Sequence, residues 1–535
     1  MKLNKLVMLM LMLMLCIAFT ISAQDVAFLK KYAEKGDKEA MYNLANCYLN
    51  GTGGAQEDFN QAAYWLTKSA KKNYAQAQVL LAYCYIYGAG VPMDYKQAWD
   101  WVQKAVKQDS AEAHYLVATM YKDGIYVSKN WEQWLKWIRS AVKLGDANAI
   151  KDLGLTYMYG LSQAGVRQDA ATGARYLQQA AAMNNADAMY WLGKCYETGA
   201  GVTESLDNAM KYYKAASDMG MVTAITTMAK AYMRGYGVEQ DFSQAIDLLN
   251  LANAQDDPEA YYLTGDVYYY GLGVDVNEKE AASWYKRAAE AGQTSAMAQL
   301  GYMYVFGIGG EENEPKGFDY LKKAAKAELP AAYFWLGQCY ENGYGTTKNR
   351  YQAVACYQKG AEKGNNLSRF RLSEMYFEGD CVTKNVTTAF QYLRAAADDG
   401  YNPAVYRLGY EFLTGDNIHQ ETSTAIRYIK QAADNGYAFA AGALGTMYYE
   451  GSYGISKNYD YAFKYLSQAV GAPDSFADEL LADIYRELGA CYRFGRGTEV
   501  NNSMAAYYTE RAAQLGDDKS FDAVKTLRDK SQQFK

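Results

Sequence analysis

A short phrase of residues recurs about every 36 positions along almost the whole chain. It consists of an apolar residue, then Gly, Ala or Ser, and an aromatic residue four positions after the first. Ten of the twelve spacings between successive copies are 36 or 37 residues, and the other two are 39 and 44. The copies begin at Leu44, Leu81, Val117, Leu153, Leu192, Met228, Thr264, Leu300, Leu336, Leu372, Leu408, Leu444 and Leu488, with Thr264 as the polar exception. Such a period predicts a repeat array, in which each unit buries its apolar face against its neighbours.

The composition is that of a folded helical chain, and the charge argues against a nucleic-acid ligand. Half of the 535 residues are hydrophobic, 21% are charged and six are prolines, which is not the composition of a disordered chain. A solenoid of this length needs no single large core, because each repeat contacts only the next. The net charge is −6, and no stretch of the sequence is rich in Lys and Arg. We therefore expect no nucleic-acid partner, since binding of phosphate backbones depends on clustered cations.

One copy, residues 188–220, shows how the phrase predicts structure. Its apolar residues recur at helical spacing and predict a first helix that a pair of glycines ends. A second helix follows and ends at Gly220, before the next copy begins. In other copies Asp58, Asp94 and Asp241 are each followed three residues later by Gln. This spacing is typical of a capping box and predicts the start of the second helix.

The full pattern is Ala-x-x-x-Leu-Gly-x-x-Tyr-x-x-Gly-x-Gly-Val, followed by Ala-x-x-Tyr/Trp-Tyr-x-x-Ala-Ala-x-x-Gly. It resembles the Sel1-like repeat, a relative of the tetratricopeptide repeat, and its clearest copies are Ala224–Val238, Ala260–Ala289, Ala296–Gly309 and Ala332–Gly345. The resemblance implies an all-α, right-handed α-solenoid of about thirteen 36-residue helix-turn-helix repeats, and an adaptor that gathers other proteins. We expect the solenoid at 37–516, between an N-terminal capping helix at 24–36 and a C-terminal capping helix at 517–535.

The start of the chain has the features of an export signal. Residues 1–23 combine Lys2 and Lys5 with a Leu/Met-rich apolar run and a small residue, Ala23, at the end. We expect this signal peptide to be removed, which places the mature chain in the periplasm, at the cell surface or outside the cell, without a membrane-spanning segment. An uncleaved anchor and a lipoprotein modified at Cys16 are the alternatives.

Candidate catalytic and metal-binding residues are few. Five cysteines occupy the position before the repeat aromatic residue, where a small buried apolar role is expected, and they are Cys47, Cys84, Cys195, Cys339 and Cys491. A bridge among Cys339, Cys356 and Cys381 remains open. The two histidines, His114 and His419, do not have the spacing of metal ligands. The repeated glycine phrases follow helices, so we interpret them as turns and not as phosphate-binding loops. We expect no catalytic residue, metal or cofactor.

The position two residues before the key apolar residue is often aromatic. In tetratricopeptide-like arrays the first helices line the concave surface, and the resemblance places this position on that groove. A tyrosine there offers an apolar ring and a polar hydroxyl to a partner. The candidate partner-binding residues are Tyr42, Tyr115, Tyr190, Tyr262, Phe334, Phe370 and Tyr406. The alternative is that these rings only pack between repeats.

Three functions follow as hypotheses. The first is an exported, non-catalytic scaffold that binds a protein or peptide along the concave groove, with anchors held in place by the stacked helices. The second is a carbohydrate-binding protein or a helper in polysaccharide secretion, because exposed aromatic rings stack on sugars. The third is a hydrolase that acts on cell-wall material. The shortage of histidine and the lack of a nucleophile motif weigh against this third function.

Overall fold

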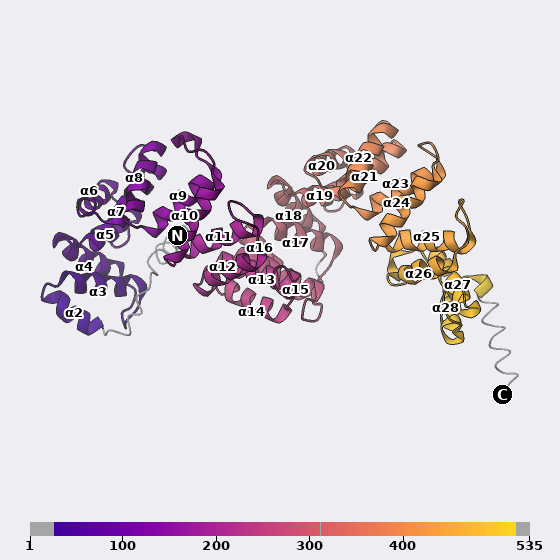
Figure 1. Ribbon diagram of the computed structural model, residues 1–535, viewed down its shortest axis with the longest axis horizontal. Coiled ribbons are helices and arrows are strands. Elements are labelled where there is room, and N and C mark those ends of the chain that lie inside the picture. Colours follow the sequence, from indigo (N-terminus) through magenta and orange to yellow (C-terminus); the bar gives the residue numbers. More distant parts are fainter. Residues whose placement is uncertain (1–25, 311, 521–535) are drawn as a thin grey trace. The chain divides into compact units, whose positions relative to one another are not determined.

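The computed structural model describes residues 26–310 and 312–520, which fold into α-helices that alternate as the first and second helices of successive repeats (Figure 1). In these residues the β-structure amounts to one isolated bridge, between Leu161 and Val166. The predicted all-α solenoid of helix-turn-helix repeats is confirmed. The expected signal peptide at 1–23, and the part of the expected C-terminal helix beyond residue 520, lie outside the described residues.

Almost every helix of the solenoid has 12 or 13 residues. The first helices are α3 (Lys38–Asn50), α5 (Ala75–Tyr87), α7 (Ala111–Asp123), α9 (Ala147–Tyr159), α11 (Ala186–Thr198), α13 (Val222–Arg234), α15 (Pro258–Tyr270), α17 (Thr294–Phe306), α19 (Pro330–Asn342), α21 (Asn366–Glu378), α23 (Asn402–Thr414), α25 (Ala438–Glu450) and α27 (Asp478–Phe494). The second helices are α4 (Phe59–Lys71), α6 (Tyr95–Val106), α8 (Trp131–Lys143), α10 (Ala170–Ala182), α12 (Leu206–Asp218), α14 (Phe242–Asn253), α16 (Glu278–Glu290), α18 (Glu314–Lys326), α20 (Arg350–Glu362), α22 (Val386–Asp398), α24 (Thr422–Asp434), α26 (Tyr459–Ala469) and α28 (Asn502–Gln514). Helix α2 (Val26–Glu34) precedes them and packs against α3.

The chain divides into two compact units, Met1–Leu263 and Thr264–Lys535, and the boundary falls inside α15. From α2 to α14 in the first unit, and from α16 to α28 in the second, each α-helix packs against the next one along the chain. Each unit is therefore a stack of helical pairs, and we describe the two units separately.

The predicted starts of the second helices are confirmed at all three aspartates. The carboxylates of Asp58, Asp94 and Asp241 accept hydrogen bonds from backbone N–H groups in the first turns of α4, α6 and α14. In a full capping box, the side chain of the Gln would accept a hydrogen bond from the backbone N–H of the capping residue. At α14 the Gln244 amide instead donates to the Asp241 carboxylate at 3.0 Å. At each of these three helices the aspartate satisfies one or two of the otherwise unpaired N–H groups.

The two irregular spacings have separate local causes. The spacing of 39 places extra residues between α9 and α10, where they form the short 3₁₀ helix Ser162–Ala164 and the bridge from Leu161 to Val166. The spacing of 44 lengthens the first helix α27 to 17 residues and adds the 3₁₀ helix Pro473–Ser475 before it. The extra residues lie in the turn between the two helices of one repeat or just before and at the start of a first helix, so the stacking of helical pairs continues past them.

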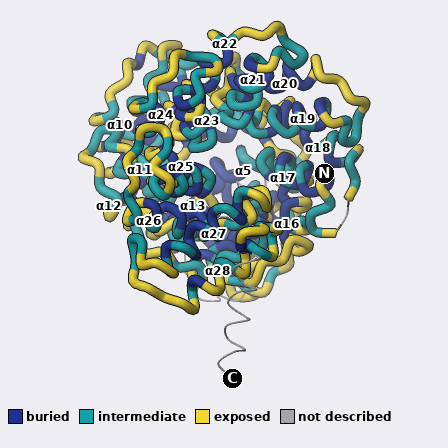
Figure 2. Tube along the Cα trace, turned by 90° about the vertical axis from the view of Figure 1, so that its right-hand side faces the viewer, coloured by how far each residue is buried: buried dark blue, intermediate teal, exposed yellow. Residues whose placement is uncertain are grey.

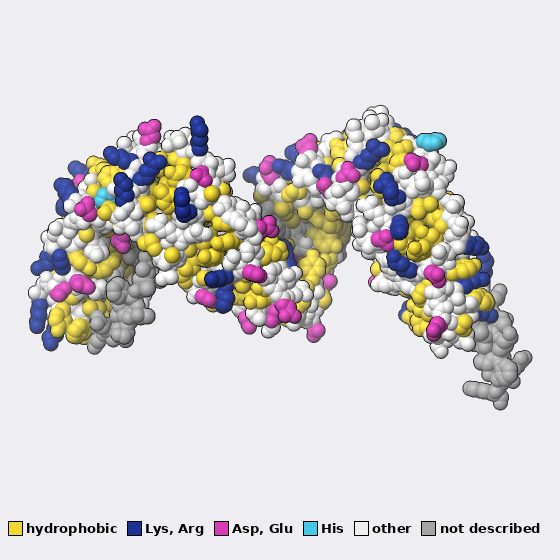
Figure 3. All heavy atoms as spheres, viewed as in Figure 1, with side chains coloured by type: hydrophobic (Ala, Val, Ile, Leu, Met, Phe, Trp, Pro, Cys, Tyr) yellow, Lys and Arg dark blue, Asp and Glu magenta, His cyan; other side chains and the backbone are white. Residues whose placement is uncertain are grey.

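Burial follows the alternation of the helices. First helices such as α5 and α17 consist mostly of buried and half-buried residues, while second helices such as α12 present more exposed positions (Figure 2). Aromatic side chains also reach the surface, and Tyr159, Tyr270 and Tyr351 are 63%, 61% and 78% exposed. Figure 3 shows hydrophobic side chains, tyrosine included, interleaved with charged ones on the surface. Within the described residues, no helix has the length and apolar character that crossing a membrane requires.

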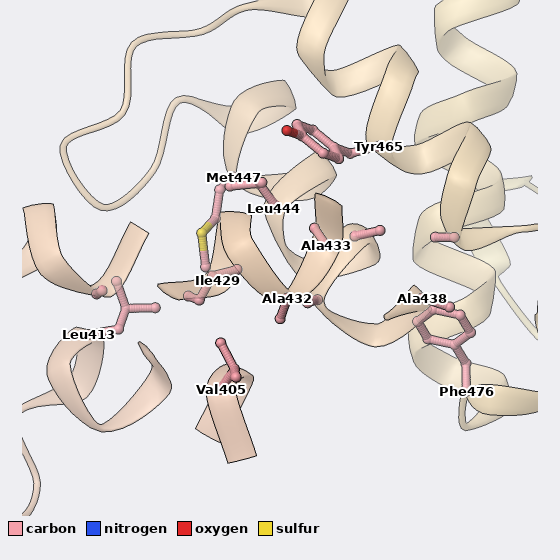
Figure 4. Packing of buried hydrophobic residues seen from close by; sticks show 14 of the residues in the cluster. Val405, Leu413, Ile429, Ala432, Ala433, Ala438, Leu444, Met447, Tyr465 and Phe476 are labelled. Carbon is pink, nitrogen blue, oxygen red and sulfur yellow. The ribbon is translucent and has the colours of Figure 1, made fainter. Parts of the chain in front are cut away.

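The core of each unit is built from successive layers. In the second unit, side chains from α23, α24, α25 and α26 converge, and Leu413, Ile429, Met447 and Tyr465 lie among them (Figure 4). These side chains come from neighbouring repeats, so one repeat completes the apolar layer of the next. Burial of this kind is the main source of helix stability in a protein, because an isolated helix of this length is marginal in water.

Four tyrosines of second helices are fully buried, and three of them pack on a glycine of the first helix in their own repeat. The pairs are Tyr213 with Gly193, Tyr285 with Gly265 and Tyr357 with Gly337. A Cβ atom on any of these glycines would overlap the tyrosine ring. At the equivalent positions of another repeat the second helix carries Leu249 and the first helix Ala229, although Leu321 and Ile429 pack on glycines, Gly301 and Gly409. The absence of a Cβ atom therefore makes room for the ring.

The hydroxyl of each tyrosine that packs on a glycine reaches a carboxylate on the first helix. The Tyr357 hydroxyl donates to Glu341 at 2.5 Å, and Arg371 from the next first helix forms an ion pair with the same carboxylate. Burial acts to raise the pKa of Glu341, but the bonds from Arg371 and Tyr357 outweigh it and hold the pKa below its usual value. The buried ring thus links the packing of two helices to a buried, charged carboxylate of the first helix.

One buried carboxylate lacks a strong cationic partner at its oxygens. Glu487 of α27 is 4% exposed, and its Oε2 accepts a hydrogen bond from Thr446 Oγ1 at 2.9 Å. Burial raises the pKa of Glu487 to about 7, and the nearby Glu450 and Asp483 act in the same direction, while Arg486 opposes them. The folded chain therefore holds this proton up to a higher pH than the unfolded chain does.

We expect Gly337→Ala to destabilise the second unit by about 1–3 kcal/mol, because the added methyl group displaces the buried Tyr357 ring. This loss exceeds the gain of about 1 kcal/mol that alanine brings inside a helix. Thermal unfolding followed by circular dichroism measures the change. The double variant Gly337→Ala with Tyr357→Leu reproduces the Ala229 and Leu249 pair and should recover most of the loss. Equal stability of the single variant and the parent would contradict this packing.

The raised pKa of Glu487 predicts that stability falls as pH rises. The unfolded side chain ionises near its ordinary pKa of about 4.3, whereas the folded one ionises near 7. The folded state therefore binds more protons between these values, and raising the pH across this range favours unfolding. The Glu487→Gln variant should lose this dependence and melt at a higher temperature than the parent at about pH 8. An identical pH dependence of the melting temperature in both proteins would rule out this origin.

Candidate functional site

The first helices of neighbouring repeats approach one another on one face of the stack. In the first unit α5 contacts α7, and in the second unit α17 contacts α19, which in turn contacts α21. We call the surface made by the first helices the first-helix face, and the opposite surface made by the second helices the outer face. Within each unit, these direct contacts place the neighbouring first helices side by side on one surface.

The seven predicted partner-binding residues all lie on first helices, in seven different repeats. Tyr115 is 8% exposed, so its ring belongs largely to the core. The other six are half-buried, and they are Tyr42, Tyr190, Tyr262, Phe334, Phe370 and Tyr406. Burial raises the pKa of Tyr42, and it raises the pKa of Tyr406 to about 12. Each half-buried ring keeps only part of its surface available to a partner.

Several of these rings pack on the next repeat. Tyr42 contacts Tyr74 with 5.4 Å between ring centres, Phe370 contacts Tyr401 at 5.7 Å, and Tyr406 contacts Tyr437 at 6.0 Å. The second residue of each pair stands immediately before the following first helix. The Tyr115 hydroxyl donates to Asp152 of the following first helix at 3.0 Å. These contacts stabilise the stacking of repeats, whatever further role the rings have.

Two of the predicted residues pack within their own repeat. Tyr190 contacts the buried Tyr213 with 5.6 Å between ring centres, and Phe334 contacts the buried Tyr357 at 5.9 Å. Tyr190 also lines a hollow on the first-helix face of the first unit. None of the other six predicted residues lines this hollow.

The hollow has a volume of about 550 Å³, which is enough for several side chains of a bound segment. Its walls come from α11, α12 and α13, from the turn after α13 and from the residues that open α15. The lining residues are Tyr190, Lys194, Glu197, Met210, Tyr213, Thr223, Thr226, Thr227, Lys230, Ala231, Arg234, Gly235, Tyr236, Asp257 and Glu259. All of them belong to the first unit.

Small residues on α13 create this space. Position 226, which is equivalent to the aromatic positions 190 and 262, holds a threonine, and Thr223 and Thr227 extend the row by one turn. The Thr226 hydroxyl donates to Asp257 at 2.5 Å, and the Thr227 hydroxyl donates to the carbonyl of Thr223 at 2.7 Å. Three small side chains thus face the large rings of the preceding repeat. In the sequence, this row of threonines at a position that is aromatic in neighbouring repeats is the signal of the hollow.

The charges around the hollow are mostly paired. Lys194 lies 2.8 Å from Glu197, which also accepts a hydrogen bond from Tyr213 at 2.6 Å. Burial acts to raise the pKa of Glu197, but these two bonds lower it further than burial raises it. Lys230 forms an ion pair with the Glu259 carboxylate at 2.6 Å. Arg234 is exposed and forms no ion pair with a described residue, so its guanidinium remains available to an external carboxylate.

A second feature of the first-helix face lies in the second unit. Tyr302 and Phe306 of α17, Trp335 of α19 and Tyr344 after α19 form a cluster of rings around a small depression. The ring centres of Tyr302 and Trp335 are 4.5 Å apart, and those of Phe306 and Tyr344 are 5.6 Å apart. Phe306 is 43% exposed. We call these four residues the aromatic cluster; only a comparison of neighbouring repeats would have revealed it in the sequence.

The described cysteines and histidines form no reactive centre. All seven described cysteines are free thiols, so the bridge left open among Cys339, Cys356 and Cys381 is not formed. Burial raises the pKa of Cys339 to about 12 and that of Cys356 to about 11, which keeps both thiols protonated. His114 is buried, with its Nδ1 atom 2.8 Å from the carbonyl oxygen of Ser110. Across residues 26–310 and 312–520, no group of His, Cys, Asp and Glu side chains has the arrangement of a metal site.

Comparison with known proteins identifies the repeat. The Sel1 repeat family matches thirteen successive segments, 38–74, 75–110, 111–146, 147–185, 186–221, 224–257, 258–293, 294–329, 330–365, 367–401, 402–437, 438–471 and 484–517. No curated protein sequence matches the chain.

Solved structures include two similar Sel1-type proteins. The crystal structure of c5321, a protective antigen of uropathogenic Escherichia coli with an SLR fold, is 24% identical over 88% of this chain and 90% of its own, with a TM-score of 0.46. A Sel1 repeat protein from Oxalobacter formigenes is 28% identical over 58% of this chain and 89% of its own, with a TM-score of 0.41. The thirteen matched segments span nearly the whole described chain, and the protein therefore belongs to the Sel1 repeat family.

Proposed function

We propose that this protein is an exported, non-catalytic scaffold that binds an extended segment of a partner protein on its first-helix face. The Sel1 repeats support a scaffold or adaptor role in general. The observation that carries the specific proposal is the hollow of about 550 Å³ between α11 and α13. It combines aromatic walls, threonine hydroxyls and an available cation in one place, as interfaces for peptide segments do.

The mode of binding follows from the rigidity of the stack. The floor of the hollow includes the buried Tyr213, and its rim includes Tyr190 and the exposed Tyr236. These rings are held by helix packing before any partner arrives, so binding costs little ordering of the scaffold. Apolar side chains of the partner would contact the rings. An acidic side chain would pair with Arg234, because this cation has no partner among the described residues.

Export is part of this proposal and rests on the composition of residues 1–23. We therefore expect the partner among proteins of the cell envelope or its surroundings. Affinity capture from the envelope with the full chain, followed by mass spectrometry, is the experiment that names it. A chain recovered only from the cytoplasm of its own cells would remove export from the proposal and leave the scaffold role standing.

We expect Thr227→Trp to abolish partner capture, because the indole ring fills the hollow from the half-buried face of α13. Ser243→Trp, on the exposed face of α14 in the same repeat, is the matched control and should capture the partner normally. Circular dichroism of both variants checks that each remains folded. Partner capture by Thr227→Trp at the level of the parent would exclude the hollow as the binding site.

A second candidate function, binding of envelope polysaccharide, is favoured by the aromatic cluster of the second unit. The exposed Phe306 ring and the half-buried rings beside it offer apolar surface, and the apolar faces of sugar rings stack on such surfaces. If this function holds, the full chain should bind glycans on an array, and Trp335→Ala should reduce that binding at least about tenfold through loss of the central ring. Absence of binding to every envelope polysaccharide tested would eliminate this candidate.

A further inference from the structure

The outer face of the first three repeats carries a row of basic side chains that the scaffold role does not use. Lys71, Lys107 and Lys143 stand at the same position of three successive repeats, at the ends of α4, α6 and α8. One turn earlier, the same helices carry Lys68, Lys104 and Arg139. All six are exposed, and none forms an ion pair with another described residue. We call these six residues the outer cationic row.

The row is specific to these repeats. A cation at the end of a helix is often explained by its interaction with the helix dipole. In the next three second helices of the same unit, however, the position of Lys71 is occupied by Ala182, Asp218 and Ala254. The dipole of these helices therefore does not require a lysine there. Figure 3 shows basic side chains gathered over this part of the first unit.

Few acidic residues on these three helices offset the positive charge of the outer cationic row. Helix α4 contains no acidic residue, α6 contains Asp100 and α8 contains Glu132, while Lys96 and Lys136 add further positive charge. The whole chain has a net charge of −6, so the rest of the molecule is more acidic than the average. The row is therefore a local concentration of positive charge in an acidic chain, and such a patch attracts an anionic surface.

Aromatic rings accompany the cations. The Lys68 ammonium lies 4.4 Å from the centre of the Tyr64 ring, and Tyr64 is 50% exposed. The Lys104 ammonium lies 3.7 Å from the Trp101 ring. Leu144, beside Lys143, is 39% exposed. Trp101 is only 9% exposed, so Tyr64 is the ring that reaches the surface beside a cation. An exposed tyrosine next to a lysine is typical of surfaces that meet the headgroups of a bilayer, where rings sit at the interface and cations pair with phosphates.

We propose that the outer cationic row docks on a membrane surface rich in acidic phospholipids. The chemistry is phosphate recognition by several exposed cations, each of which contributes independently near a negatively charged bilayer. A spread of lysines at helix ends suits a fluid array of headgroups, which can move to meet them. In this arrangement the outer face lies on the membrane, and the first-helix face remains free for a partner.

The test uses vesicle flotation with the full chain, on phosphatidylcholine alone and on phosphatidylcholine mixed with phosphatidylglycerol. The readout is the difference between the two vesicles, because an apolar N-terminal segment would contribute to both. We expect preferential binding to the acidic vesicles that weakens as salt is added. The variant Lys71→Glu/Lys107→Glu/Lys143→Glu should reduce that binding about a hundredfold.

The matched control changes three exposed lysines on second helices of the second unit, as Lys286→Glu/Lys322→Glu/Lys430→Glu. It alters the net charge equally and should keep the preference for acidic vesicles. An equal loss in the control, or full binding by the row variant, would overturn the proposal. Binding of soluble polyglutamate without any preference for acidic vesicles would assign the row to an acidic protein instead. Thr227→Trp should not change vesicle binding, which separates this test from that of the scaffold role.

Discussion

Close contact between the two helices of each repeat is the interaction on which this structure depends. The first helix presents a small residue, and the second helix packs a large side chain against it, as Tyr357 does at Gly337 and Leu321 does at Gly301. A repeat that could not bring its helices this close would leave a gap in the layer, and packing contacts would be lost on both sides of it. Stacking then completes each layer with residues from the neighbouring repeat.

This packing scheme leaves two surfaces with different chemistry. The first helices contact each other, so their exposed positions are few and are filled by rings and paired charges, as at Tyr190 and Lys194. The second helices present more exposed positions, where charged residues are tolerated without cost to the core. The hollow and the outer cationic row lie on these two surfaces of the first unit, so one molecule has room for two kinds of contact at once.

The repeat pattern predicts the helix on which each candidate residue lies, but it leaves open how much of each ring packs between repeats. Tyr115 was expected on the groove, and it is 8% exposed because its hydroxyl reaches Asp152 of the next repeat. Tyr42 and Phe370 also bridge to the following repeat. The hollow was missed for the opposite reason, since attention to aromatic positions passes over Thr226 and Thr227, whose small size makes the space. Neither result follows from one repeat alone, because both depend on the side chains of its neighbour.

Local signals in the chain are enough to specify the repeat, its helices and their starts. Asp58 caps α4 and Asp241 caps α14 through bonds to residues three positions away, so short-range chemistry sets these boundaries. The grouping of Lys71, Lys107 and Lys143 arises differently, because they are 36 residues apart in the sequence and become neighbours only when repeats stack. Cations that recur once per repeat are far apart in the linear sequence and form no cluster there. Stacking of the repeats brings equivalent residues side by side, so the surfaces that they form are apparent only in the tertiary structure.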